Sequence, residues 1–218
     1  MTNLEQALTS GARQLGVELS TEQSASLLRY LELLHKWNRA YNLTAVRDPQ
    51  DMLSRHLLDS LSVANLLTGQ RVLDVGTGPG LPGIPLAILY PERHFELLDS
   101  NGKKTRFLIE ARQQLGLKNL EVHCCRVEKL QDPRGFDAIT SRAFASLADM
   151  ANGCEHLLAE GGKLFAMKGQ YPTEELSQLP KHFIVDECFS LSVPGVNEAR
   201  HLLLISRRSA SEPSARDN

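Results

Sequence analysis

A glycine-rich segment, LDVGTGPGLPG at residues 73–83, carries the pattern in this chain that is most suggestive of chemistry. An apolar run from Arg71 to Val75 leads into it, and a helical pattern follows. The glycines permit positive φ angles and let a ligand approach backbone N–H groups, and a helix start behind such a loop favours anionic groups. The segment therefore predicts a small-molecule site at a strand end, although a tight turn without a ligand has the same appearance.

The spacing of the glycines separates two kinds of ligand. A literal G-x-G-x-x-G dinucleotide pattern exists at Gly78, Gly80 and Gly83. This match begins at Gly78, two residues after Gly76, although the first glycine of the fingerprint should directly follow the strand. Counted from Gly76, the third glycine position holds Leu81. The match to a dinucleotide-binding loop is therefore displaced from the strand that should lead into it.

Asp74 and two prolines argue further against a phosphate ligand. Asp74 puts a negative charge where phosphates would otherwise lie, and Pro79 and Pro82 remove two N–H donors. An acid at this place suits a ligand with a cationic end. S-adenosylmethionine carries a sulfonium and an ammonium group and no phosphate. We therefore expect this cofactor, with Asp74, Gly76 and Gly78 in its site.

The next two strand patterns end in residues that suit an adenosine. Asp99 ends one of them, where a carboxylate can accept hydrogen bonds from both ribose hydroxyls; capping the next helix is its alternative role. Val127 and Glu128 follow the third strand, where a backbone amide and an apolar side chain can meet an adenine. Glu128 is alternatively a solvated loop carboxylate. Asp99 is shared with nicotinamide enzymes, so the order along successive strand ends is what favours a nucleoside site.

Helical patterns precede the glycine loop. Leucines at helical spacing predict an amphipathic helix near 22–38. Asp48, followed by Pro49, predicts the N-cap and first position of another helix, which stops near Gly69. That helix turns four apolar side chains inward: Leu53, Leu57, Leu61 and Ala64.

From residue 71 onward, short strand-like runs alternate with helical stretches near 83–90, 102–115 and 146–159. This alternation predicts an α/β fold with a mostly parallel sheet and helices on both faces. Gly116 and the pair Gly161-Gly162 are predicted helix ends. The segments 182–193 and 199–208, joined by PGVNE, predict an antiparallel pair. We expect a helical extension over 1–68, the main domain over 69–208 and a disordered tail over 209–218.

Composition excludes several classes of protein. The 218 residues carry a formal net charge of −2 and are 42% hydrophobic, as in a globular domain. The sequence has neither an apolar run long enough to cross a membrane nor a signal-peptide pattern, so we expect a cytoplasmic protein without a membrane partner. Cys124 and Cys125 are predicted mid-strand, buried and inert. Neither the four cysteines nor the seven histidines show metal-ligand spacing, so no metal is expected.

Five stretches of the sequence carry specific motifs: HKWNRAYNLTAVRDP (35–49), RHLLDSL (55–61), DVGTGPGLPGIPLA (74–87), LLDSNGKKTRFL (97–108) and SRAFASL (141–147). These stretches closely resemble the bacterial GidB family, whose members are 16S ribosomal RNA guanine-N7 methyltransferases that use S-adenosylmethionine. The resemblance covers roughly residues 25–206; Asn101 and Thr105 differ where the family varies, and the tail from 209 matches nothing.

The resemblance implies a class I methyltransferase fold: a Rossmann-like, seven-stranded sheet with an antiparallel last strand and an N-terminal helical extension. It implies a target guanine in the 530 loop of the small subunit's RNA, so the expected partner is 16S ribosomal RNA or the small subunit, bound by a monomer. The family's cofactor positions fall on Gly76, Leu81, Val127, Glu128 and Arg142.

Methylation of guanine N7 requires few catalytic groups from the protein. N7 carries a lone pair and no proton, so alignment of the reactants matters more than a general base. The segment Thr140–Phe144 lacks the paired prolines typical of enzymes that methylate exocyclic amines. Arg142 is a candidate for orienting cofactor or base, or else pairs with Asp74 or Glu128. Phe144 is a candidate for stacking on the target base; its alternative role is as a residue of the core.

Scattered basic residues are candidates for RNA contact, although each alone is typical of a solvated surface charge. We expect them to form one patch above the pocket, and we expect Trp37 and Tyr41 to lie in the core. The candidates are Lys36, Arg39, Arg47, Arg55, His56, Lys168, Arg200 and His201.

Three alternatives to an RNA methyltransferase remain open at this point. The first is an S-adenosylmethionine-dependent methyltransferase that acts on another substrate. The second is an NAD-type oxidoreductase, which Asp74, Leu81 and the lack of a Tyr-x-x-x-Lys pair disfavour. The third is a nucleotide-binding module without catalysis.

Overall fold

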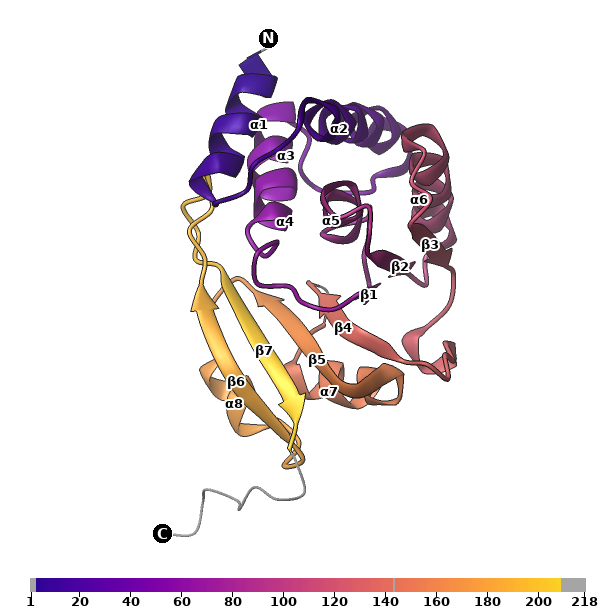
Figure 1. The fold of residues 1–218 in the computed structure, drawn as a ribbon, viewed down its shortest axis with the longest axis vertical. Helices are drawn as coiled ribbons and strands as arrows, with labels where there is room; N and C mark the ends of the chain where they lie inside the picture. The colour runs from indigo at the N-terminus through magenta and orange to yellow at the C-terminus, as the bar shows by residue number, and fades with distance from the viewer. Residues whose placement is uncertain (1–2, 143, 209–218) are drawn as a thin grey trace.

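The computed structural model describes residues 3–142 and 144–208, so the predicted tail lies outside the described part. One seven-stranded sheet with the strand order β3-β2-β1-β4-β5-β7-β6 runs through the molecule (Figure 1). Its strands are β1 (Arg71–Val75), β2 (His94–Leu98), β3 (Leu120–His123), β4 (Phe136–Ser141), β5 (Leu158–Lys168), β6 (Phe183–Ser190) and β7 (His201–Arg207).

Strands β1 to β5 are parallel, and β7 pairs antiparallel with both β5 and β6. The sheet therefore has an antiparallel last strand, and the predicted antiparallel pair is confirmed. The carboxyl ends of the parallel strands share one edge of the sheet with the start of β7. Ligands of open α/β sheets bind at that edge.

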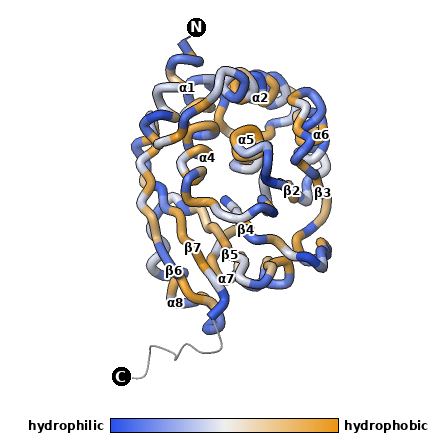
Figure 2. The backbone as a smooth tube through the Cα atoms, viewed as in Figure 1, coloured by the Kyte–Doolittle hydropathy of each residue, from blue (hydrophilic) through white to orange (hydrophobic). Residues whose placement is uncertain are grey.

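Helices cover both faces of the sheet (Figure 1). One apolar cluster joins α1, α2, α5 and α6 to one face, and a second joins α7 to the other. In Figure 2, α5 is drawn largely in orange, which marks it as an apolar helix. The helices are α1 (Asn3–Gln14), α2 (Thr21–Tyr41), α3 (Pro49–Met52), α4 (Asp59–Leu61), α5 (Gly83–Leu89), α6 (Gly102–Leu115), α7 (Leu147–Cys154) and α8 (Thr173–Ser177).

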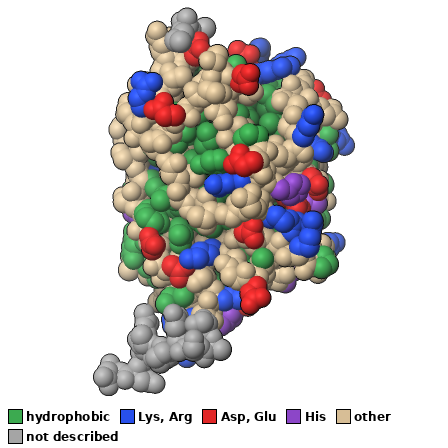
Figure 3. Space-filling view, viewed as in Figure 1, with side chains coloured by type: hydrophobic (Ala, Val, Ile, Leu, Met, Phe, Trp, Pro, Cys, Tyr) green, Lys and Arg blue, Asp and Glu red, His purple; other side chains and the backbone are tan. Residues whose placement is uncertain are grey.

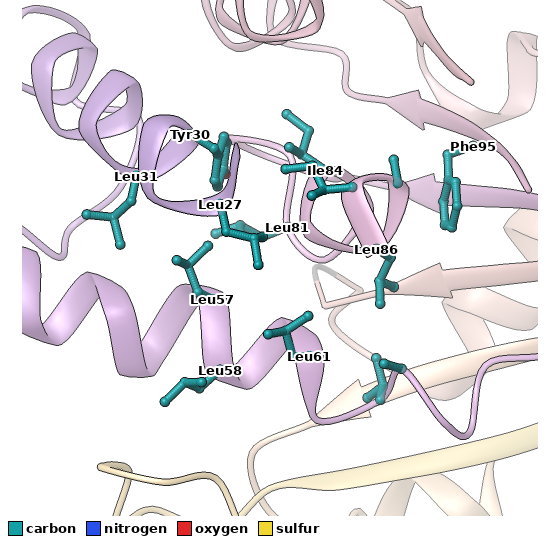
Figure 4. Packing of buried hydrophobic residues seen from close by; sticks show 14 of the residues in the cluster. Leu27, Tyr30, Leu31, Leu57, Leu58, Leu61, Leu81, Ile84, Leu86 and Phe95 are labelled. Carbon is teal, nitrogen blue, oxygen red and sulfur yellow. The ribbon is translucent and has the colours of Figure 1, made fainter. Parts of the chain in front are cut away.

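Helix α2 begins and ends at clear caps. Ser20 and Gln23 form a reciprocal capping box at its start, and Asn42 closes it with a left-handed φ of 50°. Its buried face packs on the glycine loop and α5 (Figure 4). Leu27 and Tyr30 point toward Leu81 and Ile84 there.

The segment after Asp48 differs in part from its prediction. Asp48 is the N-cap, since its side chain accepts hydrogen bonds from two backbone N–H groups of α3, and the four predicted apolar residues are buried. A π-helical segment, η1 (Leu53–Leu58), interrupts the helix, which ends at Leu61 instead of near Gly69. The Ser62 hydroxyl donates to the Asp59 carbonyl oxygen at 2.7 Å and competes there with further helix.

One predicted helix end is confirmed and one is wrong. Gly116 caps α6 with a φ of 66°. Gly161 and Gly162 lie inside β5, because α7 already ends at Cys154 and a short 3-10 turn, η3 (Glu155–Leu157), follows. A Cβ atom at Gly162 would lie 2.5 Å from the Phe136 carbonyl oxygen, so this glycine permits a close approach of β4.

Three side chains lie in other surroundings than predicted. Strand β3 ends at His123, so Cys124 is exposed and Cys125 half-buried; neither is mid-strand. Tyr41 is 46% exposed, where it stacks on the half-buried Trp37 with 5.1 Å between ring centroids. The position of Tyr41 in the last turn of α2 leaves its ring outside the core. Among the described residues, no helix is long and apolar enough to span a membrane.

Candidate cofactor and substrate site

The turn after β1 is built from glycines in left-handed conformations. Gly76, Gly78 and Gly80 have φ angles of 65°, 62° and 100°. The Gly76 amide donates to the Leu98 carbonyl oxygen at 2.8 Å, which ties the start of the turn to the end of β2. Since L-residues rarely adopt these φ angles, other side chains would strain the turn.

Asp74 is buried at the base of this turn, with 1% of its surface exposed. Its Oδ2 atom accepts hydrogen bonds from the Thr77 hydroxyl at 2.7 Å and from the Gly83 amide at 2.8 Å. Its Oδ1 atom is buried and has no hydrogen-bond partner among the described residues. Burial raises the pKa of Asp74 to about 7, against the hydrogen bonds that lower it. A cationic group beside Oδ1 would satisfy this oxygen and favour the ionised form.

Asp99 connects the turn to the next strand end. Its Oδ2 accepts a 2.9 Å hydrogen bond from the Gly78 amide, and its Oδ1 accepts one of 2.8 Å from the Asn101 amide. Lys104 lies 3.5 Å from Oδ2. Asn101 itself caps α6. Asp99 therefore orders the glycine loop, and each oxygen keeps a lone pair for a further donor.

A cavity of about 330 Å³ opens at the carboxyl ends of the first strands. Four of the eight predicted cofactor residues line it, whereas Leu81 packs into the core and Asp74, Gly78 and Arg142 lie outside its lining. Residues that line it include Gly76, Asp99, Ser100, Val127, Glu128 and Phe144.

Arg142 pairs with a residue that its sequence prediction did not name. Its Nη1 atom lies 3.1 Å from Oδ2 of Asp59, so the predicted pairing with Asp74 or Glu128 is wrong. The Nε atom of Arg200 lies 2.8 Å from the other oxygen of Asp59. Asp59 is 2% exposed and so joins two cations from different strand ends.

Five of the RNA-contact candidates line two further cavities. Lys168, Arg200 and His201 line a second cavity, together with Arg142. Arg39 and Arg47 line another one, beside His35 and Asn38. Lys36 lies on α2 with Arg39.

Two candidates on η1 are engaged within the protein. Arg55 forms a 2.6 Å ion pair with Glu198 at the surface. His56 is 5% exposed and lies 3.0 Å from the Thr44 hydroxyl, so it presents no surface to RNA in this conformation. Burial lowers the pKa of His56. His56 directly precedes Leu57 and Leu58 in the π-helical segment, and all three side chains are buried.

Two residues of the site had escaped the sequence analysis. Tyr30 on α2 donates a 2.8 Å hydrogen bond to the Pro79 carbonyl oxygen in the glycine loop. Asp59 carries a detectable signal, because a charge between Leu58 and Leu61 falls within an apolar, inward-facing stretch. No local sequence pattern predicts a role for Tyr30 in the site, because it has the helical spacing of the apolar residues around it.

A polar network lies at the opposite end of β1 and β2. The Arg71 guanidinium is 2.8 Å from Glu96 and 2.6 Å from Asp132, and His123 lies 2.7 Å from the other Glu96 oxygen. Burial acts to raise the pKa of Asp132, but the hydrogen bonds from Arg71 and Arg134 together outweigh it and lower the pKa to about 2. Figure 3 shows basic, acidic and histidine side chains gathered over β2 and β3.

Three possible metal ligands belong to the same network. Ligand atoms of His94, Glu96 and Glu121 lie within 4.8 Å of one another, a grouping that the sequence analysis did not expect. Arg71 and His123 already occupy the two oxygens of Glu96. The network therefore has the character of a charge cluster that stabilises the fold.

Comparison with known proteins agrees with this geometry. Residues 23–203 match the GidB family, described as rRNA small subunit methyltransferase G. A "Ribosomal RNA small subunit methyltransferase G" of Hahella chejuensis is 53% identical over 205 residues, 94% of each chain. One of Stutzerimonas stutzeri is 55% identical over 204 residues, 93% of this chain and 95% of the relative.

Solved structures share the fold at low sequence identity. A SAM-dependent methyltransferase from Aquifex aeolicus matches with a TM-score of 0.57 and 19% identity, over 78% of this chain and 96% of that one. TrmN from Thermus thermophilus matches with a TM-score of 0.56 and 20% identity, over 72% of this chain and 53% of that one. The fold is that of class I methyltransferases, and the family match favours methyl transfer over the oxidoreductase and binding-module alternatives. This chain belongs to the GidB family of small-subunit ribosomal RNA methyltransferases.

Proposed function

We propose that this protein transfers a methyl group from S-adenosylmethionine to N7 of a guanine in the 530 loop of 16S ribosomal RNA. The observation that carries the proposal is the cavity at the carboxyl ends of the strands, lined by Gly76, Asp99, Val127 and Glu128, in a chain of this family. The cavity volume of about 330 Å³ lies within the range of small-molecule sites.

The residues present fit this cofactor. Asp74, which precedes the lining residue Val75, has an oxygen without a hydrogen-bond partner among the described residues, and this oxygen suits an ammonium group. Asp99 has lone pairs left for ribose hydroxyls. Val127 and Glu128 line the part of the cavity after β3, where an adenine would lie. The turn at Gly76 and Gly78 lets a ligand approach the backbone. When bound, the cofactor supplies a methyl carbon activated by positive sulfur.

The protein's part in the reaction is alignment. Since guanine N7 has no proton to remove, the side chains need to hold the base in line with the methyl carbon and exclude water. Phe144 lies half-buried at the cavity wall and offers a ring against which the base can stack. Arg142, two residues earlier, provides a fixed positive charge on the substrate side.

The two parts of the chain then have separate tasks. We propose residues 1–68 as a helical extension and 69–208 as the methyltransferase domain, acting as a monomer on the small subunit or its RNA. Basic residues of both parts face the two cavities outside the cofactor site: Arg39 and Arg47 from the extension, Lys168 and Arg200 from the domain. Lys36 and Arg55 add surface charge beside them.

Methyl transfer to unmodified small subunits tests the proposal. Purified protein is incubated with tritiated S-adenosylmethionine and subunits that lack the modification, and the RNA is digested to nucleosides. The label is expected in 7-methylguanosine. Label in another nucleoside, in a ribosomal protein, or none in the presence of bound cofactor would refute the proposed activity.

A further inference from the structure

Asp59 holds two arginines at the wall of a second cavity, next to the cofactor cavity. Its two carboxylate oxygens lie 3.1 Å from Arg142 Nη1 and 2.8 Å from Arg200 Nε. The carboxylate is 2% exposed, whereas the two arginine side chains are 30% and 21% exposed. Asp59 therefore lines the cavity with little exposed surface and fixes the orientation of the two more exposed guanidinium groups.

This second cavity has a volume of about 270 Å³ and lies at the carboxyl-terminal edge of the parallel strands. Its walls come from the carboxyl ends of β4 and β5 and from the start of β7, the strand ends that follow those of the cofactor cavity. Arg142 lines this cavity, and Phe144, two residues on, lines the cofactor cavity.

The groups around the cavity recognise an anion. Two arginines and one aspartate leave one positive charge, and Lys168 adds a cation that Glu175 neutralises at 2.8 Å. No further hydrogen bond is found for Nε and Nη2 of Arg142 or for Nη2 of Arg200 among the described residues. Planar guanidinium groups with free N–H donors suit phosphate oxygens.

We propose, on the basis of the proposed function, that this cavity binds a backbone phosphate of the RNA strand beside the target guanine. Arg142 and Arg200 donate to the phosphate oxygens, and Asp59 acts as a positioning residue that orients both guanidinium groups. A nucleobase fits less well, because both oxygens of the carboxylate already accept from arginine. The π-helical segment η1, which places Asp59, is a type of irregularity often found at functional sites.

RNA binding by an Arg200→Gln variant tests the phosphate site. Binding to an unmodified 16S ribosomal RNA transcript is measured by filter retention over a range of salt concentrations. We expect the Kd to rise about tenfold and the salt slope to fall by about one. The affinity for S-adenosylhomocysteine, measured by calorimetry, stays unchanged. Arg134→Gln, an equal charge change at the amino end of the sheet, leaves both RNA parameters unchanged; Arg134 is 73% exposed.

Two further variants separate charge from folding and orientation. Arg200→Gln leaves the buried Asp59 carboxylate with one partner. The double variant Asp59→Asn/Arg200→Gln removes this buried charge, and we expect it to bind RNA as weakly as Arg200→Gln alone. Asp59→Asn alone adds one net positive charge but releases both arginines, and we expect its RNA Kd to rise severalfold. Tighter RNA binding by Asp59→Asn would contradict the positioning role.

Two results would overturn the inference. RNA binding by Arg200→Gln and the double variant at the level of Arg134→Gln would refute the phosphate site. An equal loss of S-adenosylhomocysteine affinity would assign the cavity to the cofactor's carboxylate and refute it as well. These results are independent of the proposed function, which fails instead if the wild-type protein binds the cofactor and methylates no guanine.

Discussion

The Tyr30 hydroxyl donates a 2.8 Å hydrogen bond to the Pro79 carbonyl oxygen, so α2 holds the glycine loop from outside the sheet. Tyr30 is fully buried, and burial raises its pKa, which keeps the hydroxyl protonated as a donor. The N-terminal helices and the loop thus share a polar contact as well as an apolar core. This contact predicts that the extension contributes to cofactor affinity.

Tyr30→Phe tests this coupling. Loss of the hydrogen bond, about 1 kcal/mol, is expected to weaken S-adenosylhomocysteine binding about fivefold by calorimetry. Tyr90→Phe is the matched control, since the Tyr90 hydroxyl donates to the Ala64 carbonyl oxygen at 2.9 Å, away from the loop. Equal affinities for the two variants would contradict the coupling.

Asp74 makes cofactor binding depend on pH. Its pKa of about 7 means that the carboxylate ionises as the pH rises through neutrality, and a cationic group binds to the ionised form. We expect the affinity for S-adenosylhomocysteine to fall as the pH is lowered from 8 to about 5.5, approaching tenfold per pH unit below 7. Asp74→Asn should flatten this profile; an unchanged profile in the variant would rule out Asp74 as its origin.

Asp74 also affects stability, with the opposite dependence on pH. Its folded-state pKa lies above its ordinary value of 3.8, so the folded protein without ligand binds more protons than the unfolded chain between these two values. Its contribution to the free energy of unfolding is present below about pH 4 and is lost as the pH rises to about 7. Denaturant unfolding of the wild type and Asp74→Asn across this range measures the difference, and parallel curves would contradict the assignment.

Asp99→Ala is expected to weaken cofactor binding by about 30-fold or more, because it removes the ribose acceptor and frees the Gly78 amide. Asp48→Ala is the control, since Asp48 also accepts hydrogen bonds from two backbone N–H groups, those of Gln50 and Asp51. Both variants should lose about 1 kcal/mol of stability. Calorimetry should show weak binding for Asp99→Ala alone; unaltered affinity would exclude Asp99 from the site.

Arg71→Met should lower the free energy of unfolding by about 3 kcal/mol, because Glu96, 3% exposed, loses its cationic partner. Lys163→Met breaks the more exposed pair with Asp186 and should cost less than about 1 kcal/mol. Urea unfolding at pH 7 compares them. Similarly small losses of unfolding free energy in the two variants would show that the Arg71 network contributes little to the stability of the fold.

The sequence predicted those features whose signals are local. The glycine turn, the Asp48 cap and the end of α6 at Gly116 each follow from residues within a few positions of one another. The end of α7 was misplaced, because Gly161 and Gly162 serve a close approach of β4 that only the sheet register reveals.

Contacts over long sequence separations could not be predicted in the same way. The partners of Asp59 lie directly after β4 and directly before β7, and the contact with Arg200 spans 141 positions. Only the order of the strands brings them together. His56 was assigned to the surface because of its neighbours' charge, but the π-helical segment turns it inward.

Position-specific mapping of the methyl group is the most direct test of the central claim. After reaction of the purified protein with unmodified small subunits, chemical cleavage at N7-methylated guanines is read out along the 16S ribosomal RNA. We expect one new cleavage site, at a guanine of the 530 loop, that depends on S-adenosylmethionine. Incorporated methyl groups without cleavage at any guanine, or cleavage only outside this loop, would contradict the account.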